Sequence, residues 1–192
     1  RPAIFKKVLL GLIVFVAAFC ALVATRPTDF RVSRSATMPV APDTVFAHIN
    51  DLKKWQEWSP WAKLDPSCKT VFEGPVAGVG AKFSWAGNND VGEGSMAIIE
   101  SRAPESVRFK LVWLKPMEGE SEAVFTFKPE GGATHVTWTM TGKNGFVGKA
   151  VSLFMDCDKM VGGQFEQGLS NLKGIVASAK PPTNEATKQT TP

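Results

Sequence analysis

Hydrophobic and polar residues alternate over two regions of the chain, residues 29–38 and about 70–141, at the period of two that is typical of half-buried β-strands. In the first region, DFRVSRSATM, Phe30 and Val32 alternate with polar neighbours, and Pro39 follows its end. In the second, turn signals made of glycine, proline and asparagine separate runs of four to ten residues. The second region therefore predicts five or six antiparallel strands joined in a meander.

One face of the predicted sheet is rich in large apolar side chains. The residues that alternate onto this face are Ala81, Phe83, Trp85, Val107, Phe109, Leu111, Trp113, Ala123, Phe125, Phe127, Val136, Trp138 and Met140. A sheet with one apolar face must be covered by another layer. Both a packed core and the lining of a cavity would give this alternation.

Two other regions follow the helical period of three to four residues. Residues 42–49 open with Pro-Asp, a helix start signal, and the pattern breaks near residues 50–51 before a second short helix that ends near Trp58. After Gly145 one apolar stripe continues to the end of the domain. Its residues are Val147, Val151, Phe154, Val161, Phe165, Leu169, Leu172 and Val176.

This C-terminal helix is the only predicted element able to cover the sheet. The sequence therefore predicts an α+β domain in which a long helix lies across a curved antiparallel sheet. The pair Gly162–Gly163 lies within the helix, where each glycine costs about 1 kcal/mol relative to alanine. We expect another group to approach the helix closely at this pair, or the helix to bend there.

The N-terminal segment predicts a single transmembrane helix. Residues 8–25, VLLGLIVFVAAFCALVAT, are 18 residues without a charge. At a rise of about 1.5 Å per residue they cover roughly 27 Å, close to the bilayer hydrocarbon thickness of about 30 Å. Residues 1–7 then form a short basic tail, 26–29 a linker and 30–178 one domain. Residues 179–192 have no large apolar side chain and are predicted to be a disordered tail.

A cleaved secretory signal is the alternative interpretation of this segment. Leu22-Val23-Ala24 carries a large residue at the first small position of a cleavage site, so an uncleaved anchor fits better. Basic residues lie on both sides of the span, which weakens the positive-inside bias. The short segment before the span favours an N-terminus inside. The expected localisation is therefore single-pass in a membrane, with the domain on the non-cytoplasmic side.

The charge balance argues against a nucleic-acid partner. The chain has 22 Lys and Arg against 18 Asp and Glu, a formal net charge of +4. Four basic residues, Arg1, Lys6, Lys7 and Arg26, flank the span, and the remaining 18 balance the acidic ones. The positive charge therefore belongs to the anchor, and the neutral domain carries no basic stripe.

Groups that could move protons or attack a substrate are few, since the chain has two histidines and no tyrosine. His135 alternates with the apolar residues of its strand and is expected to face solvent. His48 lies at the flank of the first short helix. No spacing of cysteine and histidine suggests a metal site, and no cofactor motif is present. Cys68 and Cys157 are expected to be unpaired thiols, although a disulfide between them is the alternative outside the cytoplasm.

Asp158 is a weak candidate for a catalytic acid or base. It falls on the C-terminal apolar stripe between Phe154 and Val161, where desolvation would raise the pKa of an isolated carboxyl. The alternatives are an ion pair, or a helix break near Met155 that makes Asp156 or Asp158 the N-cap of a second segment.

The stretch WQEWSPW concentrates three tryptophans, Trp55, Trp58 and Trp61, beside a Ser-Pro pair that ends the short helix. A cluster in this place could plug one end of the space between sheet and helix. Alternatively it forms an aromatic gate at a cavity mouth, which requires a partly exposed indole.

Three segments resemble the START-like superfamily, also called SRPBCC, and within it bacterial polyketide cyclase/dehydrase-like proteins. They are VFAHINDLKKWQEWSPWAKLDP, GPVAGVGAKFSWAGN and DKMVGGQFEQGLSNLK. The resemblance covers roughly residues 30–178. It implies the helix-grip fold, in which a curved antiparallel sheet wraps a long C-terminal helix and leaves an apolar cavity between them. It does not imply a reaction.

We therefore expect a membrane-anchored protein that binds a hydrophobic small molecule or lipid in this cavity. The expected ligand-binding residues are Trp58, Trp61, Phe83, Trp85, Phe109, Leu111, Trp113, Phe125, Phe127, Trp138, Asp158, Val161 and Phe165. The alternatives are a cyclase, dehydrase or hydrolase type of enzyme acting on an apolar substrate, and a protein-interaction module without a ligand.

Overall fold

The computed structural model describes residues 2–179. Seven strands form one antiparallel sheet in the spatial order β1-β7-β6-β5-β4-β3-β2. They are β1 (Asp29–Met38), β2 (Lys69–Glu73), β3 (Lys82–Ala86), β4 (Glu93–Arg102), β5 (Ser106–Lys115), β6 (Gly119–Glu130) and β7 (Ala133–Lys143). The predicted meander is confirmed, because each strand from β2 to β7 pairs with its neighbour in sequence.

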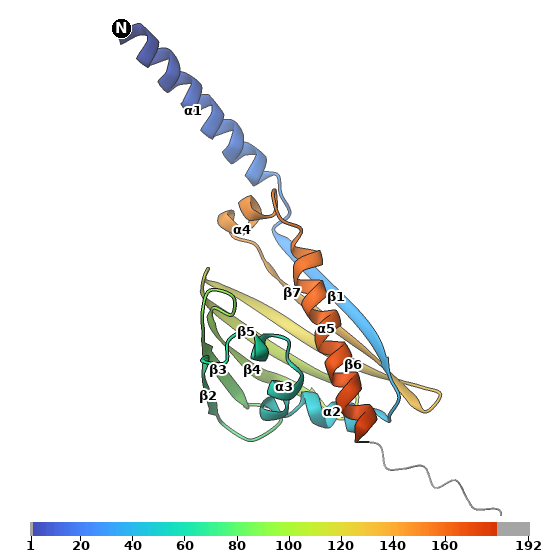
Figure 1. The fold of residues 1–192 in the computed structure, drawn as a ribbon. Helices are drawn as coiled ribbons and strands as arrows, with labels where there is room; N and C mark the ends of the chain where they lie inside the picture. Colours follow the sequence, from blue (N-terminus) through green and yellow to red (C-terminus); the bar gives the residue numbers. More distant parts are fainter. Residues whose placement is uncertain (1, 180–192) are drawn as a thin grey trace, which may run out of the picture.

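The helices lie on one face of this sheet or beyond its end. They are α1 (Pro2–Ala24), α2 (Pro42–Ile49), α3 (Leu52–Trp58), the 3₁₀ turn η1 (Trp61–Lys63), α4 (Phe146–Val151) and α5 (Cys157–Ser178). Figure 1 shows the long α5 crossing the sheet along β1 and β7, with α2 and α3 beside its C-terminal half. The expected helix-grip arrangement is confirmed. We call the covered face of the sheet its inner face.

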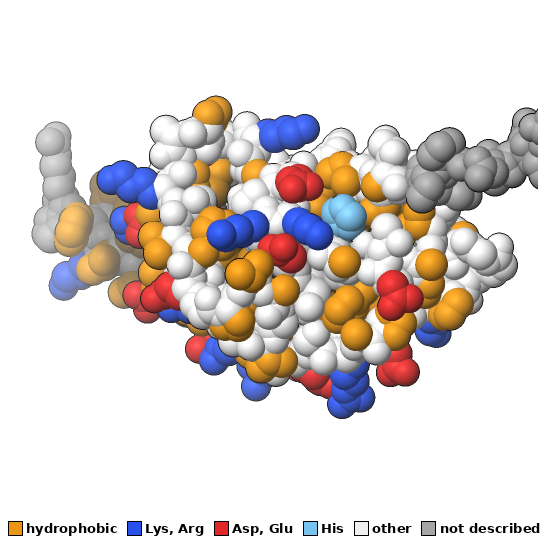
Figure 2. Space-filling view, turned by 90° about the horizontal axis from the view of Figure 1, so that it is seen from below, with side chains coloured by type: hydrophobic (Ala, Val, Ile, Leu, Met, Phe, Trp, Pro, Cys, Tyr) orange, Lys and Arg blue, Asp and Glu red, His pale blue; other side chains and the backbone are white. Residues whose placement is uncertain are grey.

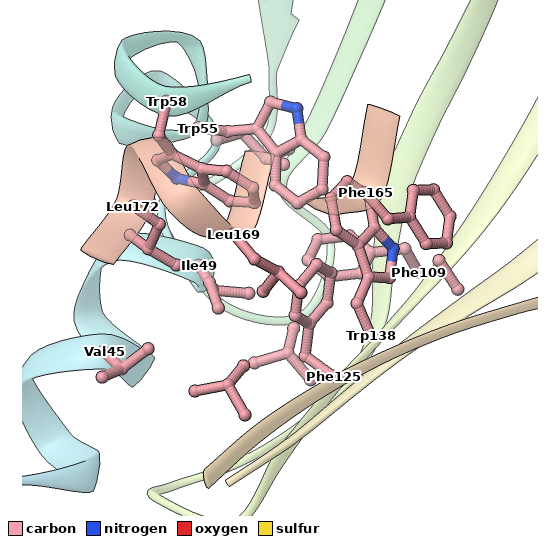
Figure 3. Packing of buried hydrophobic residues seen from close by; sticks show 14 of the residues in the cluster. Val45, Ile49, Trp55, Trp58, Phe109, Phe125, Trp138, Phe165, Leu169 and Leu172 are labelled. Atoms are coloured by element: carbon pink, nitrogen blue, oxygen red, sulfur yellow. The ribbon is translucent and has the colours of Figure 1, made fainter. Parts of the chain in front are cut away.

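The core lies between the inner face and α5. Figure 3 shows aromatic rings from the sheet meeting Trp55 and Trp58 of α3 and Phe165 of α5. The α5 residues buried here are Phe165, Leu169, Leu172 and Val176, at the helical spacing seen in the sequence. Gly168 lets α5 approach closely, since a β-carbon there would lie 3.1 Å from the ring of Trp138 and 3.2 Å from Pro60.

The predicted continuous stripe after Gly145 is wrong in its first half. The helix breaks between α4 and α5, and Val147 and Phe154 are exposed instead of buried. Asp156 is the N-cap of α5, and its carboxylate accepts a hydrogen bond from the backbone N–H of Lys159 at 3.1 Å. The break arises here because a capped helix start competes with continuation of the helix.

The N-terminal helix α1 projects away from the domain (Figure 1). Within the described residues it is the one helix long and apolar enough to cross a membrane, over Ile4–Ala24 with a mean hydropathy of 2.6. This length and composition fit either a membrane span or a signal sequence. Its last turns contact α4, where Val23 is buried and Phe19 half-buried. Apart from Ala179, the tail predicted over residues 179–192 lies outside the described residues.

Candidate ligand-binding face of the sheet

Rows of directly paired residues cross the inner face, because opposite residues in an antiparallel sheet share a face. One row crosses all seven strands near the end of the sheet where β1 begins. It consists of Phe30, Gly142, Ser121, Leu111, Met96, Phe83 and Phe72. The next row toward that end alternates glycine and tryptophan. It consists of Gly119, Trp113, Gly94 and Trp85, and ends at Thr70 on β2.

Four aromatic rings from these two rows form a ladder on β2, β3 and β5. Phe72 and Phe83 have ring centroids 5.2 Å apart, Phe83 and Trp85 stack at 5.6 Å, and Trp85 meets Trp113 edge to face at 5.6 Å. We call Phe72, Phe83, Trp85 and Trp113 the aromatic ladder. Phe83 is buried, whereas Trp85 and Trp113 are half-buried and Phe72 is 38% exposed. The ladder thus presents apolar ring surface that the protein does not fully cover.

Small residues beside the ladder leave room for its indole rings to lie flat against the sheet. A β-carbon at Gly94 would lie 2.7 Å from the ring of Trp85, so the indole occupies the space above that glycine. The indole N–H of Trp85 donates to the carbonyl oxygen of Val91 at 3.3 Å, and that of Trp113 donates to the hydroxyl of Ser121 at 3.2 Å. Both indoles therefore satisfy their polar group within the protein and offer their ring faces to a partner.

A second aromatic cluster lies under α5 and is closely packed. Trp138 stacks on Phe165 with centroids 3.9 Å apart and planes at 7°, and Trp55 contacts Trp138 at 5.4 Å. Trp58, Phe109 and Phe125 in the same cluster are completely buried. Side chains fill the space between sheet and helix at this point (Figure 3). Trp55 and Trp58 thus help to fill the space between the sheet and α5, which is what the plug hypothesis predicts.

Trp61 differs from the other two tryptophans of the WQEWSPW stretch. It lies on η1, is half-buried, and meets Trp138 at 6.0 Å and Phe165 at 6.4 Å, both edge to face. It thus covers the packed cluster while keeping part of its indole exposed. The partly exposed indole that the gate hypothesis requires is therefore present at Trp61.

Asp65, a few residues after Trp61, fastens this loop to the β3–β4 hairpin. Its buried carboxylate accepts hydrogen bonds from the Ser67 hydroxyl at 2.6 Å and from the backbone N–H of Asn88 at 2.7 Å. The hydrogen bond from Ser67, followed by that from Asn88, lowers the pKa of Asp65. Because Trp85 donates to Val91 of the same hairpin, Asp65 also helps to position the ladder.

Asp158 is an ion-pair partner of Arg34, which reaches α5 from β1. The Arg34 guanidinium donates to the carboxylate of Asp158 at 2.9 Å and to that of Glu166 at 2.7 Å. The Asp158 side chain is 55% exposed, and hydrogen bonding from Arg34 lowers its pKa. The expectation of a desolvated carboxyl with a raised pKa is therefore wrong, because the helix break turns this first turn of α5 outward to the β1 arginine.

The expected site residues thus fall into three places. The ladder and the part of the sheet beside it contain Phe83, Trp85, Leu111 and Trp113. Trp61 and Val161 are half-buried and pack against the core, with Trp61 over Trp138 and Phe165. The packed core contains Trp58, Phe109, Phe125, Phe127, Trp138 and Phe165. Asp158 lies apart from both, at the start of α5. Sequence reasoning missed Phe72, Arg34 and Asp65, although the Gly162–Gly163 pair was a signal for the close approach of Arg34.

The remaining polar groups of the described residues 2–179 lie apart from one another. His135 is half-buried on the outer face, and His48 is half-buried on α2, with its Nδ1 2.9 Å from the carbonyl oxygen of Thr44. Cys20, Cys68 and Cys157 are free thiols, as expected, and burial raises the pKa of Cys68. In the described part of the chain, no group of three or more histidine, cysteine or acidic residues is placed to hold a metal ion.

The outer face carries a separate surface depression of about 630 Å³ over β1, β7, β6 and β5. Charged residues of both signs line it, among them Arg31, Lys110, Glu120 and Lys143. Lys110 and Glu120 form an ion pair of 3.1 Å across it. Its chemistry suits water and ions rather than an apolar molecule.

The comparisons with known proteins agree with this fold. The family model for polyketide cyclase/dehydrase and lipid transport matches residues 29–177. The chain belongs to this family. Its START-like fold and helix-grip architecture are those expected from the sequence, and the family description covers proteins that act on hydrophobic ligands. No curated protein matches the chain.

Solved structures share the fold at low sequence identity. Protein TTHA0849 from Thermus thermophilus is 20% identical with a TM-score of 0.55, covering 79% of this chain and 100% of its own. Ara h 8.0201 is 14% identical with a TM-score of 0.55, covering 78% and 99%. Protein CV1439 from Chromobacterium violaceum is 15% identical with a TM-score of 0.54, covering 78% and 98%. At these identities the likeness shows the fold alone.

Proposed function

We propose that this protein is a membrane-anchored binding protein for a hydrophobic small molecule or lipid, which lies against the aromatic ladder. The observation that carries the proposal is the pair Trp85 and Trp113. Both indoles are half-buried and have their N–H groups satisfied within the protein. A ligand would therefore gain mainly by covering ring faces, which selects apolar surface over hydrogen-bonding groups.

The proposed contact residues are those near the ladder. Phe83 and Leu111 form its floor, Trp85 and Trp113 its exposed rings, and Trp61 and Val161 belong to the elements that cover the inner face. The completely buried rings of Trp58, Phe109 and Phe125 belong to the packed core on the same face of the sheet. In this proposal Asp158 and Arg34 hold α5 in place and do not touch the ligand.

The membrane anchor is the second half of the proposal. The apolar stretch of α1, Ile4–Ala24, comprises 21 residues, which at about 1.5 Å per residue is close to bilayer thickness. The first β1 residue, Asp29, follows α1 after four residues. The ladder row lies near this end of the sheet, so a bound apolar molecule would have a short path to the bilayer. We place the domain on the non-cytoplasmic side.

A family member that acts as an enzyme would need a group that transfers protons near the ligand. Near the ladder the described inner face offers the hydroxyls of Thr70 and Ser121, and that of Ser121 is engaged with Trp113. Asp158 is ionised and paired with Arg34. Binding without turnover is therefore the function that the geometry supports best.

The test is native mass spectrometry of residues 27–192 purified without detergent, followed by titration with an apolar fluorescent dye. We expect a copurifying lipid-like species, and dye fluorescence that the extracted lipid competes away. Trp113→Ala should weaken dye binding by an order of magnitude or more, roughly the loss of one buried aromatic contact. A protein that purifies empty and binds no dye would contradict the proposal.

Leu114→Ala is the matched control. Leu114 follows Trp113 on β5 but points to the opposite face and is exposed. Its truncation should leave dye affinity unchanged. If Leu114→Ala weakened binding as much as Trp113→Ala, the dye would be reporting general surface hydrophobicity and not the ladder.

A further inference from the structure

The connection from β7 to α5 carries apolar side chains that no part of the domain covers. We call residues 146–155, which comprise α4 and the turn after it, the α4 segment. Phe146 is 55% exposed, Val147 57% and Met155 49%. Phe154 is 79% exposed, the largest fraction of any large hydrophobic side chain in the described residues, those of α1 included. Isolated exposed hydrophobic residues are ordinary, but four on one short segment indicate a partner.

The position of the α4 segment identifies that partner. It lies against the last turns of α1, where Phe19 is half-buried and Val23 is completely buried. Figure 1 shows α4 at the end of the domain from which α1 leaves. The linker between α1 and β1 is also held against the domain, since the backbone N–H of Asn144 donates to the carbonyl oxygen of Thr28 at 2.7 Å. The segment is therefore held at the level where α1 would leave the bilayer.

The chemistry of the segment suits a lipid surface. Its sequence, FVGKAVSLFM, contains Lys149, and Lys143 lies three residues before the segment, where basic groups near a bilayer favour anionic headgroups. The acidic Asp156 that follows Met155 pairs with Lys159 at 3.5 Å. Figure 2 shows the opposite end of the molecule, where hydrophobic side chains and charged side chains of both signs are exposed together.

We infer that the α4 segment is a second membrane contact, with Phe154 and Met155 inserted at the boundary between headgroups and acyl chains. This inference rests on the proposed function, because it requires α1 to span the bilayer. Together the two contacts fix the domain's orientation, with the ladder end of the sheet toward the membrane. The exposed Leu114 and Met117 lie at the same end of the sheet, at and after the end of β5.

The test is fluorescence of the full chain in vesicles of phosphatidylcholine and phosphatidylglycerol. An environment-sensitive NBD label is placed at one engineered cysteine at a time, in a background where Cys20, Cys68 and Cys157 are alanine. Phe154→Cys reports on the α4 segment. Val14→Cys reports on the span, and Glu130→Cys reports on the β6–β7 turn at the far end of the sheet.

We expect lipids with a shallow spin label to quench NBD at residue 154 several-fold more than NBD at residue 130, and aqueous dithionite to spare residue 154. If residue 14 is quenched by lipid while residue 154 behaves like residue 130, the second contact is overturned and the anchor stands. If residue 14 is also accessible to water, the anchor fails, and this inference fails with it. Lipid copurification with residues 27–192 tests ligand binding separately.

A substitution pair tests the same contact through orientation. Phe154→Ser in the full chain should allow the domain to tilt, so that dithionite reaches NBD at residue 117, after Met117→Cys, several-fold faster. Val76→Ser removes a hydrophobic side chain of similar exposure, 67%, from the loop after β2. It should leave the rate at which dithionite reaches NBD at residue 117 unchanged. Equal accessibility of residue 117 in all three proteins would overturn the proposed orientation.

Discussion

The guanidinium of Arg34 occupies the space that a β-carbon at residue 162 would need, so Gly162 is the position at which β1 reaches through to the α5 backbone. From that place Arg34 donates to Asp158 and Glu166, which lie one helical turn to either side of the glycine. It also donates to the backbone carbonyl of Asp158 at 3.1 Å. Glycine is therefore required on α5 for a reason of space, at the cost of helix propensity.

Alanine substitutions of Gly162 and Gly163 should separate the effect of steric room for Arg34 from the effect of helix propensity. Gly163→Ala should raise the free energy of unfolding by up to about 1 kcal/mol, since no atom lies within 4 Å of its β-carbon. Gly162→Ala should give less than this gain or a net loss, because it displaces Arg34 from its carboxylates. Chemical denaturation of both variants measures the difference. Equal stabilisation by the two substitutions would show that Arg34 moves aside freely.

The Arg34–Asp158 pair predicts a dependence of stability on pH. Hydrogen bonding from Arg34 lowers the folded-state pKa of Asp158 below its unfolded value of about 3.9. The ionised carboxylate therefore stabilises the fold above the unfolded pKa, and this stabilisation is lost as the pH falls through the folded pKa. Asp158→Asn should be less stable than the wild type at neutral pH and should lose less stability on acidification.

Denaturation curves from about pH 7 to pH 2 measure this effect, since the range begins well above the unfolded pKa and extends into the acid region below it. Glu118→Gln, in the exposed turn between β5 and β6, is the control for a general change of charge and should follow the wild type. A curve for Asp158→Asn that runs parallel to the wild type at every pH would mean that the pair contributes nothing to folding.

The strand order, the two short helices and the covering helix could be predicted because each depends on local period and turn signals. Apolar spacing alone favours one continuous stripe over the α4–α5 break, because Phe154 continues that spacing although its side chain is exposed. The break is predicted only as the alternative in which Asp156 or Asp158 caps a second segment, because periodicity does not encode contacts between distant parts of the chain. The pKa of Asp158 is lowered instead of raised for the same reason, since the arginine that lowers it comes from β1, 124 residues earlier in the chain.

The ladder could be predicted only in part for a similar reason. Alternation correctly placed Phe83, Trp85 and Trp113 on one face of the sheet. It did not distinguish these half-buried rings from the buried Phe109 and Phe125, because exposure depends on how far α5 reaches across the sheet. The WQEWSPW stretch shows the same limit, with Trp58 completely buried and Trp61 half-buried only three residues later.

The alternation of tryptophan and glycine across β3, β4 and β5 predicts a specific loss when Gly94 is replaced. In Gly94→Ala the new methyl group would collide with the Trp85 indole and with the Val112 carbonyl oxygen, 2.6 Å away. We expect a loss of about 1–3 kcal/mol, the usual cost of overpacking, together with weaker binding of an apolar dye. Near-ultraviolet circular dichroism should report the changed Trp85–Trp113 pair.

Gly119→Ala is the control for that substitution. Gly119 belongs to the same row, opposite Trp113, but nothing lies within 4 Å of its β-carbon. Its stability should stay within about 0.5 kcal/mol of the wild type, as for most exposed substitutions. If Gly94→Ala kept the tryptophan dichroism and dye affinity of this control, the indoles would not depend on the glycine for their position.

Asp65 should couple the loop after Trp61 to the ligand site. Its carboxylate holds the Asn88 N–H of the β3–β4 hairpin, and the same hairpin supplies the Val91 carbonyl that receives the Trp85 indole N–H. Asp65→Ala should therefore lower the denaturation midpoint and also loosen Trp85, with weaker dye binding and faster amide exchange at residues 87–92. Hydrogen bonding lowers the folded-state pKa of Asp65 below its unfolded value, so both effects should appear in the wild type only as the pH falls through that lowered pKa. Asp90→Ala, an exposed aspartate on the same hairpin, should leave dye binding intact. If Asp65→Ala unfolds more easily but binds dye as tightly as the wild type, Asp65 contributes to stability alone. The WSPWAKLDP loop would then have no influence on binding at the ladder.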